Sequence, residues 1–531
     1  MSVSPDLQTR YDEVPYPSLP FPTTHPDHLA VVATLLGLSP ARADRCRVLE
    51  LGCASGGNLI PLAYAYPESS FLGVDLSVVQ IRQGEELKAA LGLGNIELRA
   101  MSILDVDDGS GTFDFIICHG VYSWVPEAVR YKILEICDRH LAPQGIAFVS
   151  YNTFPGWHMR GMIRSIMQLH ERRYRDHPSQ ERIDQSRAIL NFLAEAFPGQ
   201  NTPYRVLLRA HREDLRESSD GYLFHEYLEE CNEPVYFLEF CERLATVGLR
   251  YVGDSEFRDM FRTISLTTEV RDRLKAMDLN LLEMEQYLDL LNNRMFRQTL
   301  IGHSALRPDY VVRAGRMGAF HVGSPLRPSA PDPDLASDLP EEFTSDNGII
   351  LTTPIPIVKM ALTFLGEIWP RLVAFNDLLD EARSRLSHPI PANRAADAQA
   401  LGKALLTAYA LAGRHLVWLW LCPPAFSTEV GAQPLASHLA RLQATDTDKV
   451  TNLRHEQVAL TPFDARLLRL LDGTHDREDL VEVLRSSCQE SELRLPQGGS
   501  TVTDISRVQS FLPEFIDERL RHFAKVSLLL G

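Results

Sequence analysis

Between residues 27 and 152 the hydrophobic positions follow a helical period in some stretches and form short runs of strand length in others. The helical period predicts a helix over 27–36, with Asp27 as its cap and Gly37 as its stop, and another over 59–66. The short apolar runs predict five strands, over 47–51, 70–75, 96–99, 113–118 and 146–150. Helices alternating with apolar strands predict an α/β fold with a parallel sheet.

After residue 157 apolar residues recur at helical spacing, as at Ile163 and Met167 and again at Leu190 and Leu193. We therefore expect a helical insertion over 158–232. The alternating pattern then returns, with a helix near 236–247 and strands over 249–252 and 296–301. Residues 233–303 are thus expected to complete the sheet that 1–157 begin.

The rest of the chain has a different texture. Proline, aspartate and serine are frequent over 304–347, which predicts a linker. Apolar helical stretches follow in 348–445, which we expect to form a helical middle domain. A small helical or winged-helix-like unit is expected over 446–531.

Composition limits the class of protein. The 531 residues carry a formal net charge of −17, which argues against stable nucleic-acid binding and fits a basic partner better. The eight cysteines form no CxxC pair, so we expect reduced thiols, no metal site and a cytoplasmic location. We expect no signal peptide and no membrane insertion, because the longest apolar run, 416–422, is far shorter than the ~20 residues a bilayer requires.

The turn after the first strand has the composition of a ligand-binding loop. A strand that ends in small residues and opens a helix presents unpaired backbone N–H groups to an anion. The spacing of Gly52 and Gly56 departs from the GxGxxG of dinucleotide-binding turns. The Glu50 carboxylate suits a ligand with an ammonium group better than a pyrophosphate. The methionine end of S-adenosylmethionine (SAM) carries both an ammonium and a carboxylate.

A second carboxylate, Asp75, ends the second predicted strand. In this position it can accept hydrogen bonds from both ribose hydroxyls of a nucleoside that lies across the strand ends. It would repel a 2′-phosphate, which speaks against NADP.

The segments ELGCASGGNL at 50–59 and GVDLS at 73–77 resemble motifs one and two of class I SAM-dependent methyltransferases, with Ala54 in place of the usual middle glycine. The resemblance implies a Rossmann-like sheet, Met101 and Ser102 beside the adenine, and His119 on the methionine side. The acidic residue usual at Met101 is missing, and the sequence leaves open whether Asp105 replaces it. The cofactor contacts we expect are Tyr11, Glu50, Gly52, Ala54, Gly56, Asn58, Asp75, Leu76, Met101, Ser102 and His119.

Four further segments, 11–17, 222–229, 294–300 and 352–356, resemble bacterial methyltransferases with a methyltransferase regulatory domain, a group that includes the rickettsial protein-lysine methyltransferases. The resemblance implies a helical insertion involved in dimerisation, hence a possible homodimer, and a winged-helix-like tail. The N-terminal segment is either a lid that brings Tyr11 to the cofactor or an arm packed on the surface. His225 and Glu229 share a helical face whose role is functional or structural.

Residues after the fourth and fifth strands are candidates for the methyl acceptor, because ligands of such folds bind outside the carboxyl ends of strands. Tyr122 can receive a proton, and Asn152 can orient an amine through its carbonyl group. The aromatic residues expected to contact the acceptor are Trp124, Tyr151 and Trp157. The alternative is that these rings are core packing. Methylation of protein lysines is the leading hypothesis; the others are a small-molecule methyltransferase and a catalytically silent SAM sensor.

Overall fold

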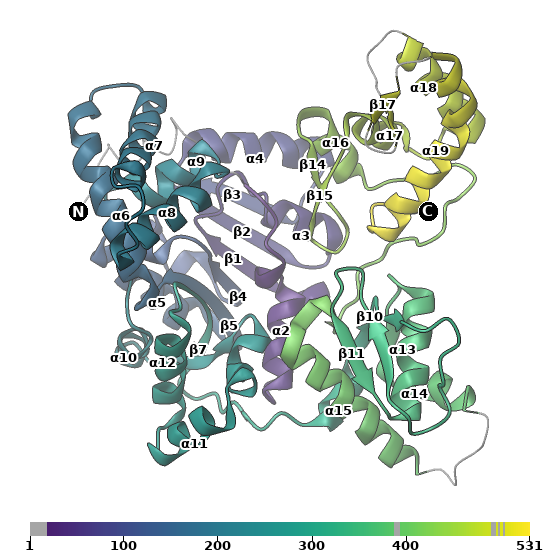
Figure 1. The fold of residues 1–531 in the computed structure, drawn as a ribbon, viewed down its shortest axis with the longest axis horizontal. Helices are drawn as coiled ribbons and strands as arrows, with labels where there is room; N and C mark the ends of the chain where they lie inside the picture. Colours follow the sequence, from purple (N-terminus) through teal and green to yellow (C-terminus); the bar gives the residue numbers. More distant parts are fainter. Residues whose placement is uncertain (1–17, 387–392, 490–494, 498–499, 503–504, 531) are drawn as a thin grey trace.

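The computed structural model describes residues 18–386, 393–489, 495–497, 500–502 and 505–530. Its main sheet has the strand order β3-β2-β1-β4-β5-β7-β6 (Figure 1). Strands β1 to β5 are parallel, and β7 runs antiparallel to both of its neighbours. The strands are β1 (Arg47–Leu51), β2 (Ser70–Asp75), β3 (Ile96–Ala100), β4 (Phe113–Cys118), β5 (Leu141–Asn152), β6 (Leu249–Asp254) and β7 (Phe296–His303). The fold class is the expected α/β class.

The apolar strands bury both faces of this sheet, as the sequence pattern indicates. In β4, Phe115 and Ile117 belong to one hydrophobic core, and Ile116 and Cys118 belong to the other. The first core is shared with α2 (Pro26–Leu35), α3 (Leu59–Ala65) and α4 (Val78–Leu91). The second is shared with α5 (Glu127–His140) and α10 (Phe237–Thr246). The carboxyl ends of the parallel strands therefore remain available for a site.

The start of α2 differs from the expectation that Asp27 is its cap. His25 is the N-cap, and its ring nitrogen Nδ1 accepts a hydrogen bond from Asp27 N at 3.0 Å. The Asp27 carboxylate instead accepts hydrogen bonds from the backbone of Leu421 and Cys422, at 3.1 and 2.7 Å. Two donors from a remote segment thus use the carboxylate that local sequence would assign to the helix end.

The insertion between β5 and α10 is helical, as expected. It consists of α6 (Gly156–Glu171), α7 (Ser179–Glu195), α8 (Pro203–Arg216), α9 (Asp220–Leu223) and the π-helix η7 (Phe224–Leu228). These helices surround a core of their own that contains Ile163, Met167, Leu190 and Leu208. They project on the side of the sheet opposite to the C-terminal half of the chain (Figure 1). Two more helices, α11 (Thr268–Ala276) and α12 (Leu281–Asn292), separate β6 from β7.

The expected linker at 304–347 is wrong, because this segment supplies strands to the middle part of the molecule. There β8 (His321–Gly323) pairs with β12 (Val373–Ala374) and β13 (Trp418–Trp420). In a second small sheet, β10 (Glu341–Thr344) pairs with β9 (Arg327–Pro328) on one side and with β11 (Ile350–Thr353) on the other. Phe343 is fully buried. Proline is compatible with this arrangement because β9, which holds Pro328, is an edge strand. Helices α13 (Pro356–Ile368), α14 (Phe375–Ser384) and α15 (Arg394–Ala412) complete this part.

The C-terminal part contains α16 (His438–Asp446), the hairpin β14 (Lys449–Thr451) and β15 (Gln457–Ala459), and the helices α17 (Pro462–Leu470), α18 (Arg477–Gln489) and α19 (Ile505–Lys525). A short hairpin, β16 (Leu495–Gln497) and β17 (Ser500–Val502), lies between the last two helices. The boundary expected at residue 446 is wrong, because Ala440 and Ala444 of α16 belong to this core. Across the described ranges, we find no helix with the length and apolar character that crossing a bilayer would require.

Candidate active site

A cavity of about 490 Å³ opens at the carboxyl ends of the parallel strands. We call the part lined by the loops after β1, β2 and β3 the cofactor end. The part lined by Trp124, Asn152, α6, the segment around η7 and the start of β7 is the acceptor end. Residues of both sequence-predicted sets therefore meet in one space. Of the expected cofactor contacts, the cavity is lined by Glu50, Gly52, Ala54, Asn58, Asp75, Leu76, Met101, Ser102 and His119. Tyr11 lies outside the described residues, and Gly56 shapes the loop without lining the cavity.

The loop after β1 is built around three residues with positive φ, Gly52 at 79°, Ala54 at 51° and Gly56 at 76°. A Cβ on Gly52 would stand 2.5 Å from a methyl carbon of Val121, so only glycine fits there. Ala54 keeps the left-handed conformation that glycine would adopt without strain. Alanine in place of the usual middle glycine therefore leaves the left-handed conformation of the loop at this position unchanged.

The expectation that this loop presents unpaired N–H groups is wrong for the three residues just named. Gly52 N donates to Val74 O at 2.8 Å, Ala54 N to Asp75 Oδ2 at 2.8 Å, and Gly56 N to Cys53 O at 2.9 Å. The loop folds back on β2, and the protein itself uses these donors. Side chains, rather than this set of backbone donors, give the cofactor end its polarity.

Glu50 is the most unusual of these side chains. It is 3% exposed; its Oε1 accepts a hydrogen bond from Asn58 Nδ2 at 2.9 Å, and its Oε2 has no hydrogen-bond partner. Burial raises the pKa of Glu50 to about 8, with the Asp75 charge acting in the same direction. A buried carboxylate oxygen without a partner is costly. A cationic group at this end of the cavity would satisfy it.

The other expected contacts surround the same space. Asp75 accepts hydrogen bonds from Ala54 N and from Ser77 N, the latter at 2.9 Å, and its backbone carbonyl accepts from Met101 N at 2.9 Å. Ser102 caps a short turn through Leu104 N, at 3.2 Å. Thus the carboxylate at the end of β2 is held by the loops after β1 and β2.

His119 lies between the two ends of the cavity. Its Nδ1 is 3.0 Å from Ser150 Oγ, which accepts a hydrogen bond from Gly120 N at 2.8 Å and so can donate its own hydrogen to the imidazole. Burial lowers the pKa of His119 to about 4, so the ring is neutral at pH 7. The ring of Phe21, whose centroid is 4.2 Å away, covers it from the N-terminal segment.

Asn58 connects the cofactor end to a remote part of the chain. Its Oδ1 accepts hydrogen bonds from Phe21 N at 3.0 Å and from Thr24 Oγ1 at 3.2 Å, and it lies 2.8 Å from Nε2 of His455. Because Oδ1 can only accept, His455 must be protonated on Nε2. Burial lowers the pKa of His455 to about 3, so the contact involves a neutral imidazole.

At the acceptor end, the structure keeps three of the five expected residues. Trp124, Asn152 and Trp157 line the cavity, and the two indole rings meet edge to face at 6.1 Å. Asn152 Nδ2 donates to Asn232 Oδ1 at 3.1 Å. Sequence reasoning missed most of the remaining lining residues of this end, which are Arg160, His225, Glu226, Glu229, Met295 and Phe296. The segments that hold the last five carried a family resemblance, but their position facing the cavity had no local signal.

The roles expected for Tyr122 and Tyr151 are contradicted, because neither residue lines the cavity. Each is 1% exposed, and both rings pack on Phe240 of α10 in the second hydrophobic core. The Tyr151 hydroxyl pairs with Thr299 Oγ1 at 3.2 Å. Alternate residues of a strand point to opposite faces, so the neighbour Asn152 faces the cavity when Tyr151 does not.

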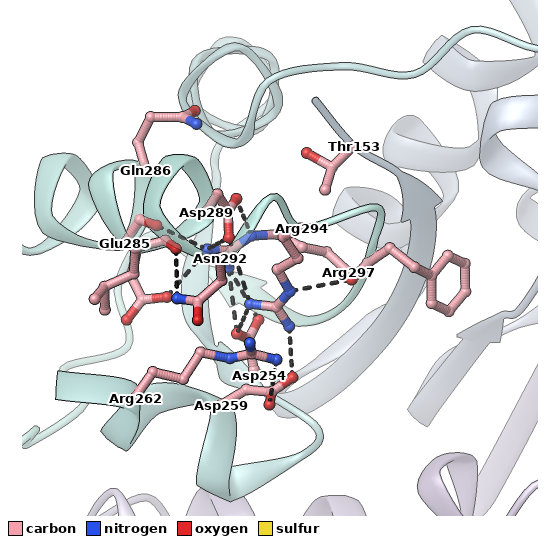
Figure 2. Close-up of polar contacts among 12 residues, drawn as sticks. Thr153, Asp254, Asp259, Arg262, Glu285, Gln286, Asp289, Asn292, Arg294 and Arg297 are labelled. Atoms are coloured by element: carbon pink, nitrogen blue, oxygen red, sulfur yellow. Dashed lines mark hydrogen bonds and ion pairs between the residues drawn. The ribbon is translucent and has the colours of Figure 1, made fainter. Parts of the chain in front are cut away.

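A buried ionic network holds β7 at the edge of the cavity (Figure 2). Arg297, fully buried, donates to Asp254, Asp289 and Glu285 at distances from 2.7 to 3.2 Å. Arg294 donates to Asp254 at 3.0 Å and, through Nε, to the carbonyl of Phe296 at 3.0 Å. The network therefore fixes the two cavity residues, 295 and 296, that lie between the arginines.

Comparison with known proteins identifies the class. Residues 48–145 match the model of a "Methyltransferase domain", 219–303 that of a "Predicted methyltransferase regulatory domain", and 432–528 that of a "PKMT, C-terminal winged helix domain". The chain is 34% identical to an uncharacterised protein of Rickettsia prowazekii, over 98% of this chain and 93% of that protein.

Two solved structures resemble the chain over nearly its whole length. PKMT2 from Rickettsia typhi is 31% identical, with a TM-score of 0.84, and its complex with AdoHcy gives 0.86; each match covers 97% of this chain and all of the other. The fold and the site thus define a class I SAM-dependent methyltransferase. Within this class, the chain belongs to the rickettsial PKMT family.

SAM is the cofactor of this class, and the cavity fits it. The unpartnered oxygen of Glu50 matches a ligand that carries an ammonium group. The absence of a side chain at Gly52 lets the loop pack directly on Val121, where a Cβ would clash. The two carboxylates that line the cavity, Glu50 and Asp75, suit a ligand with an amino-acid part and a nucleoside part.

Proposed function

We propose that this protein methylates the side-chain amine of lysine residues in other proteins. The carrying observation is that the cavity lined by the expected cofactor residues is also lined by Trp124, Trp157 and Asn152. Similarity to PKMT2 over almost the whole chain supports the same acceptor class. The net charge of −17 also suits a basic polypeptide as substrate.

We assign the cofactor contacts within this proposal as follows. Glu50, held by Asn58, pairs with the ammonium group, and the loop from Gly52 to Gly56 encloses the methionine part together with His119. Asp75, whose carboxylate is fixed by hydrogen bonds from Ala54 N and Ser77 N at the end of β2, accepts hydrogen bonds from the ribose hydroxyls. Leu76, Met101 and Ser102 enclose the adenine.

Bound SAM supplies an electrophilic methyl group, so this chain has to deliver an uncharged amine in line with it. A lysine with an ordinary pKa of ~10.4 must lose a proton at pH 7, at a cost of about 4–5 kcal/mol. The indole rings of Trp124 and Trp157 exclude water, and a less polar surrounding lowers the pKa of an amine. The Asn152 amide, oriented by Asn232, directs its carbonyl oxygen to the amine.

The proposal is tested with tritium-labelled SAM, the purified protein and a cell lysate, resolved into protein, RNA and small molecules. We expect label in protein bands and N-methyl-lysine after their hydrolysis. Label confined to small molecules or RNA would contradict the lysine assignment. Binding of SAM without any labelled product would indicate a sensor.

We also propose that the reaction takes place in the cytoplasm and that the protein forms a dimer through its insertion. All seven cysteines in the described part with an assigned state are free, which suits a reducing compartment. Large apolar side chains are exposed on the insertion, among them Leu169 and Phe192, each 65% exposed. Light scattering of the wild type and of Phe192→Ser tests the dimer, which the substitution is expected to weaken.

A further inference from the structure

The acceptor end of the cavity contains two acidic residues that the methyltransferase fold itself does not supply. Glu226 lies in η7 and Glu229 directly follows it, so both come from the helical insertion. From α6, Trp157 and Arg160 line the same end. The insertion therefore adds charge to a space whose other residues are mostly apolar or aromatic.

The Glu229 carboxylate is buried without a full set of partners. The residue is 6% exposed, and its Oε1 accepts no hydrogen bond; the imidazole Nδ1 of His225 lies 3.5 Å from this oxygen. The backbone carbonyl of Glu229 is firmly held, by Gln168 Nε2 at 2.8 Å and by Arg164. The backbone of Glu229 is thus held in place at the cavity, while the side-chain oxygen Oε1 accepts no hydrogen bond.

Glu226 differs from Glu229 because it has a cation beside it. Arg160 Nη1 lies 3.4 Å from Glu226 Oε2. Arg164, the other guanidinium of this end, donates to the backbone carbonyls of Glu226 and Glu229. In the described part of the chain, neither arginine forms an ion pair or hydrogen bond with the Glu229 carboxylate, although the Arg164 charge lies close enough to interact with it. Glu229 is therefore the acid with room for a further cation.

The aromatic walls also suit a cation on an alkyl chain. Arg160 lies over Trp157 at 5.4 Å and Arg164 over Trp124 at 5.7 Å, so both indoles already attract a positive charge on one face. Trp157 is 2% exposed, and its indole N–H has no hydrogen-bond partner. A flat apolar wall beside an unsatisfied carboxylate is the surrounding that a lysine side chain requires.

We propose that this end of the cavity is an alkylammonium subsite, in which the acceptor's methylene chain lies against Trp124 and Trp157 and its ammonium group pairs with Glu229 on binding, before the amine loses its proton for methyl transfer. The naming of lysine rests on the proposed function. The subsite itself rests on the buried, unsatisfied Glu229 carboxylate and on the aromatic walls. It makes Glu229 the residue that selects a cationic acceptor over a neutral one.

The test measures binding of n-pentylamine, which reproduces a lysine side chain together with its Cα, to the protein saturated with AdoHcy, by tryptophan fluorescence or saturation-transfer NMR. We expect n-pentylamine to bind at least tenfold more tightly than 1-pentanol. Glu229→Gln should weaken amine binding at least tenfold and leave AdoHcy affinity unchanged, whereas Glu229→Asp should retain part of the amine affinity.

The matched control is Glu181→Gln. Glu181 forms an i,i+4 pair with His177 at 3.0 Å in the same insertion, but its side chain is 45% exposed and outside the cavity. This variant should bind n-pentylamine as the wild type does. Equal binding of pentylamine and pentanol, or unchanged amine affinity in Glu229→Gln, would overturn the subsite.

Failure of the subsite and failure of the proposed function give different results. Amine binding that depends on Glu229, with label only in small molecules, supports an alkylammonium subsite and contradicts protein lysine as acceptor. Label in protein lysines together with Glu229-independent amine binding contradicts the subsite and leaves the proposed function standing.

Discussion

Two groups of buried acids in this molecule have opposite surroundings. In the network of Figure 2, Asp254, Glu285 and Asp289 all accept hydrogen bonds from Arg297. Along the cavity, Glu50 and Glu229 each keep one oxygen that accepts no hydrogen bond. All five residues are less than 9% exposed, so burial alone does not separate the groups.

The difference is whether the protein supplies the counter-charge. An ionised group removed from water is expensive unless it is paired, and a fully paired cluster can serve structure. The network joins β6, β7 and α12, and it fixes the backbone beside the cavity. Among the described residues, neither cavity acid forms an ion pair with an arginine, and a cation that arrives from outside would offset the cost of its burial. Unsatisfied buried acids therefore mark the binding site more specifically than burial does.

The largest effect should follow from breaking the network. Arg297→Met leaves Asp254 and Asp289 without their main partner and should lower the free energy of unfolding by about 3–5 kcal/mol. Urea unfolding followed by circular dichroism measures this. Arg273→Met removes an ion pair with Glu269 in which both side chains are more than 70% exposed, and it should change stability by less than about 0.5 kcal/mol. Equal losses of stability in the two variants would show that the buried network contributes no more than an exposed ion pair.

The second prediction concerns Glu50, whose substitution should weaken SAM binding and stabilise the ligand-free protein. Glu50→Gln removes a charge-assisted contact and should weaken SAM binding about 10- to 100-fold, which corresponds to ~1.5–3 kcal/mol. The same substitution removes an unpaired buried acid, so the ligand-free protein should melt at a higher temperature. Calorimetric titration measures the SAM affinity and thermal unfolding measures the melting temperature. Glu97→Gln, at an exposed position, is the control. A less stable Glu50→Gln would place Glu50 with the structural acids.

A third effect is a pH dependence of cofactor affinity. The pKa of Glu50 is raised to about 8, so most of the ligand-free protein carries a protonated carboxyl at pH 7. Pairing with an ammonium requires the ionised form, and SAM affinity should therefore rise as the pH increases from 6 towards 8. Binding at pH 7 should release close to one proton. Titrations in two buffers with different ionisation enthalpies detect it, and the release should disappear in Glu50→Gln.

The smallest effect should come from Glu285 within the network. Burial raises its pKa to about 7, with Asp254 acting in the same direction, so this acid is the easiest of the network to leave uncharged. Its ionisation costs stability as the pH rises from the unfolded value of 4.5 to about 7, and Glu285→Gln avoids this cost. We expect the free energy of unfolding at pH 7.5, measured by urea unfolding, to differ from that of the wild type by less than about 1 kcal/mol. A loss as large as that of Arg297→Met would show that every acid of the network has to be charged.

Much of the sheet could be predicted from the sequence because its signals are local. Strands β1, β2 and β4 begin and end at the expected residues, whereas β5 begins at Leu141, before the apolar run at 146–150. Gly52, Gly56 and Asp75 could be singled out because each follows or ends a predicted strand. The conformation of the loop, however, also depends on contacts with Val74, Asp75 and Val121.

The errors arise where distant contacts decide the outcome. Asp27 has the residue type of a cap, but backbone donors almost 400 positions away use its carboxylate. Proline-rich residues at 304–347 resemble a linker until their strand partners are known. Tyr122 and Tyr151 have the right place in sequence and the wrong side of the backbone. The acids of the acceptor end lie in a separate insertion, so no local pattern connects them to the strand ends.

The contact between Asn58 and His455 determines the smallest unit of this chain that retains an intact cofactor pocket. The two residues are 397 positions apart, yet the imidazole meets the amide that holds Glu50 in place. A fragment that stops after the last strand of the sheet would lose this imidazole and expose the amide to water. The winged helix is therefore an architectural component of the catalytic half, and fragments designed for crystallography or screening should retain it.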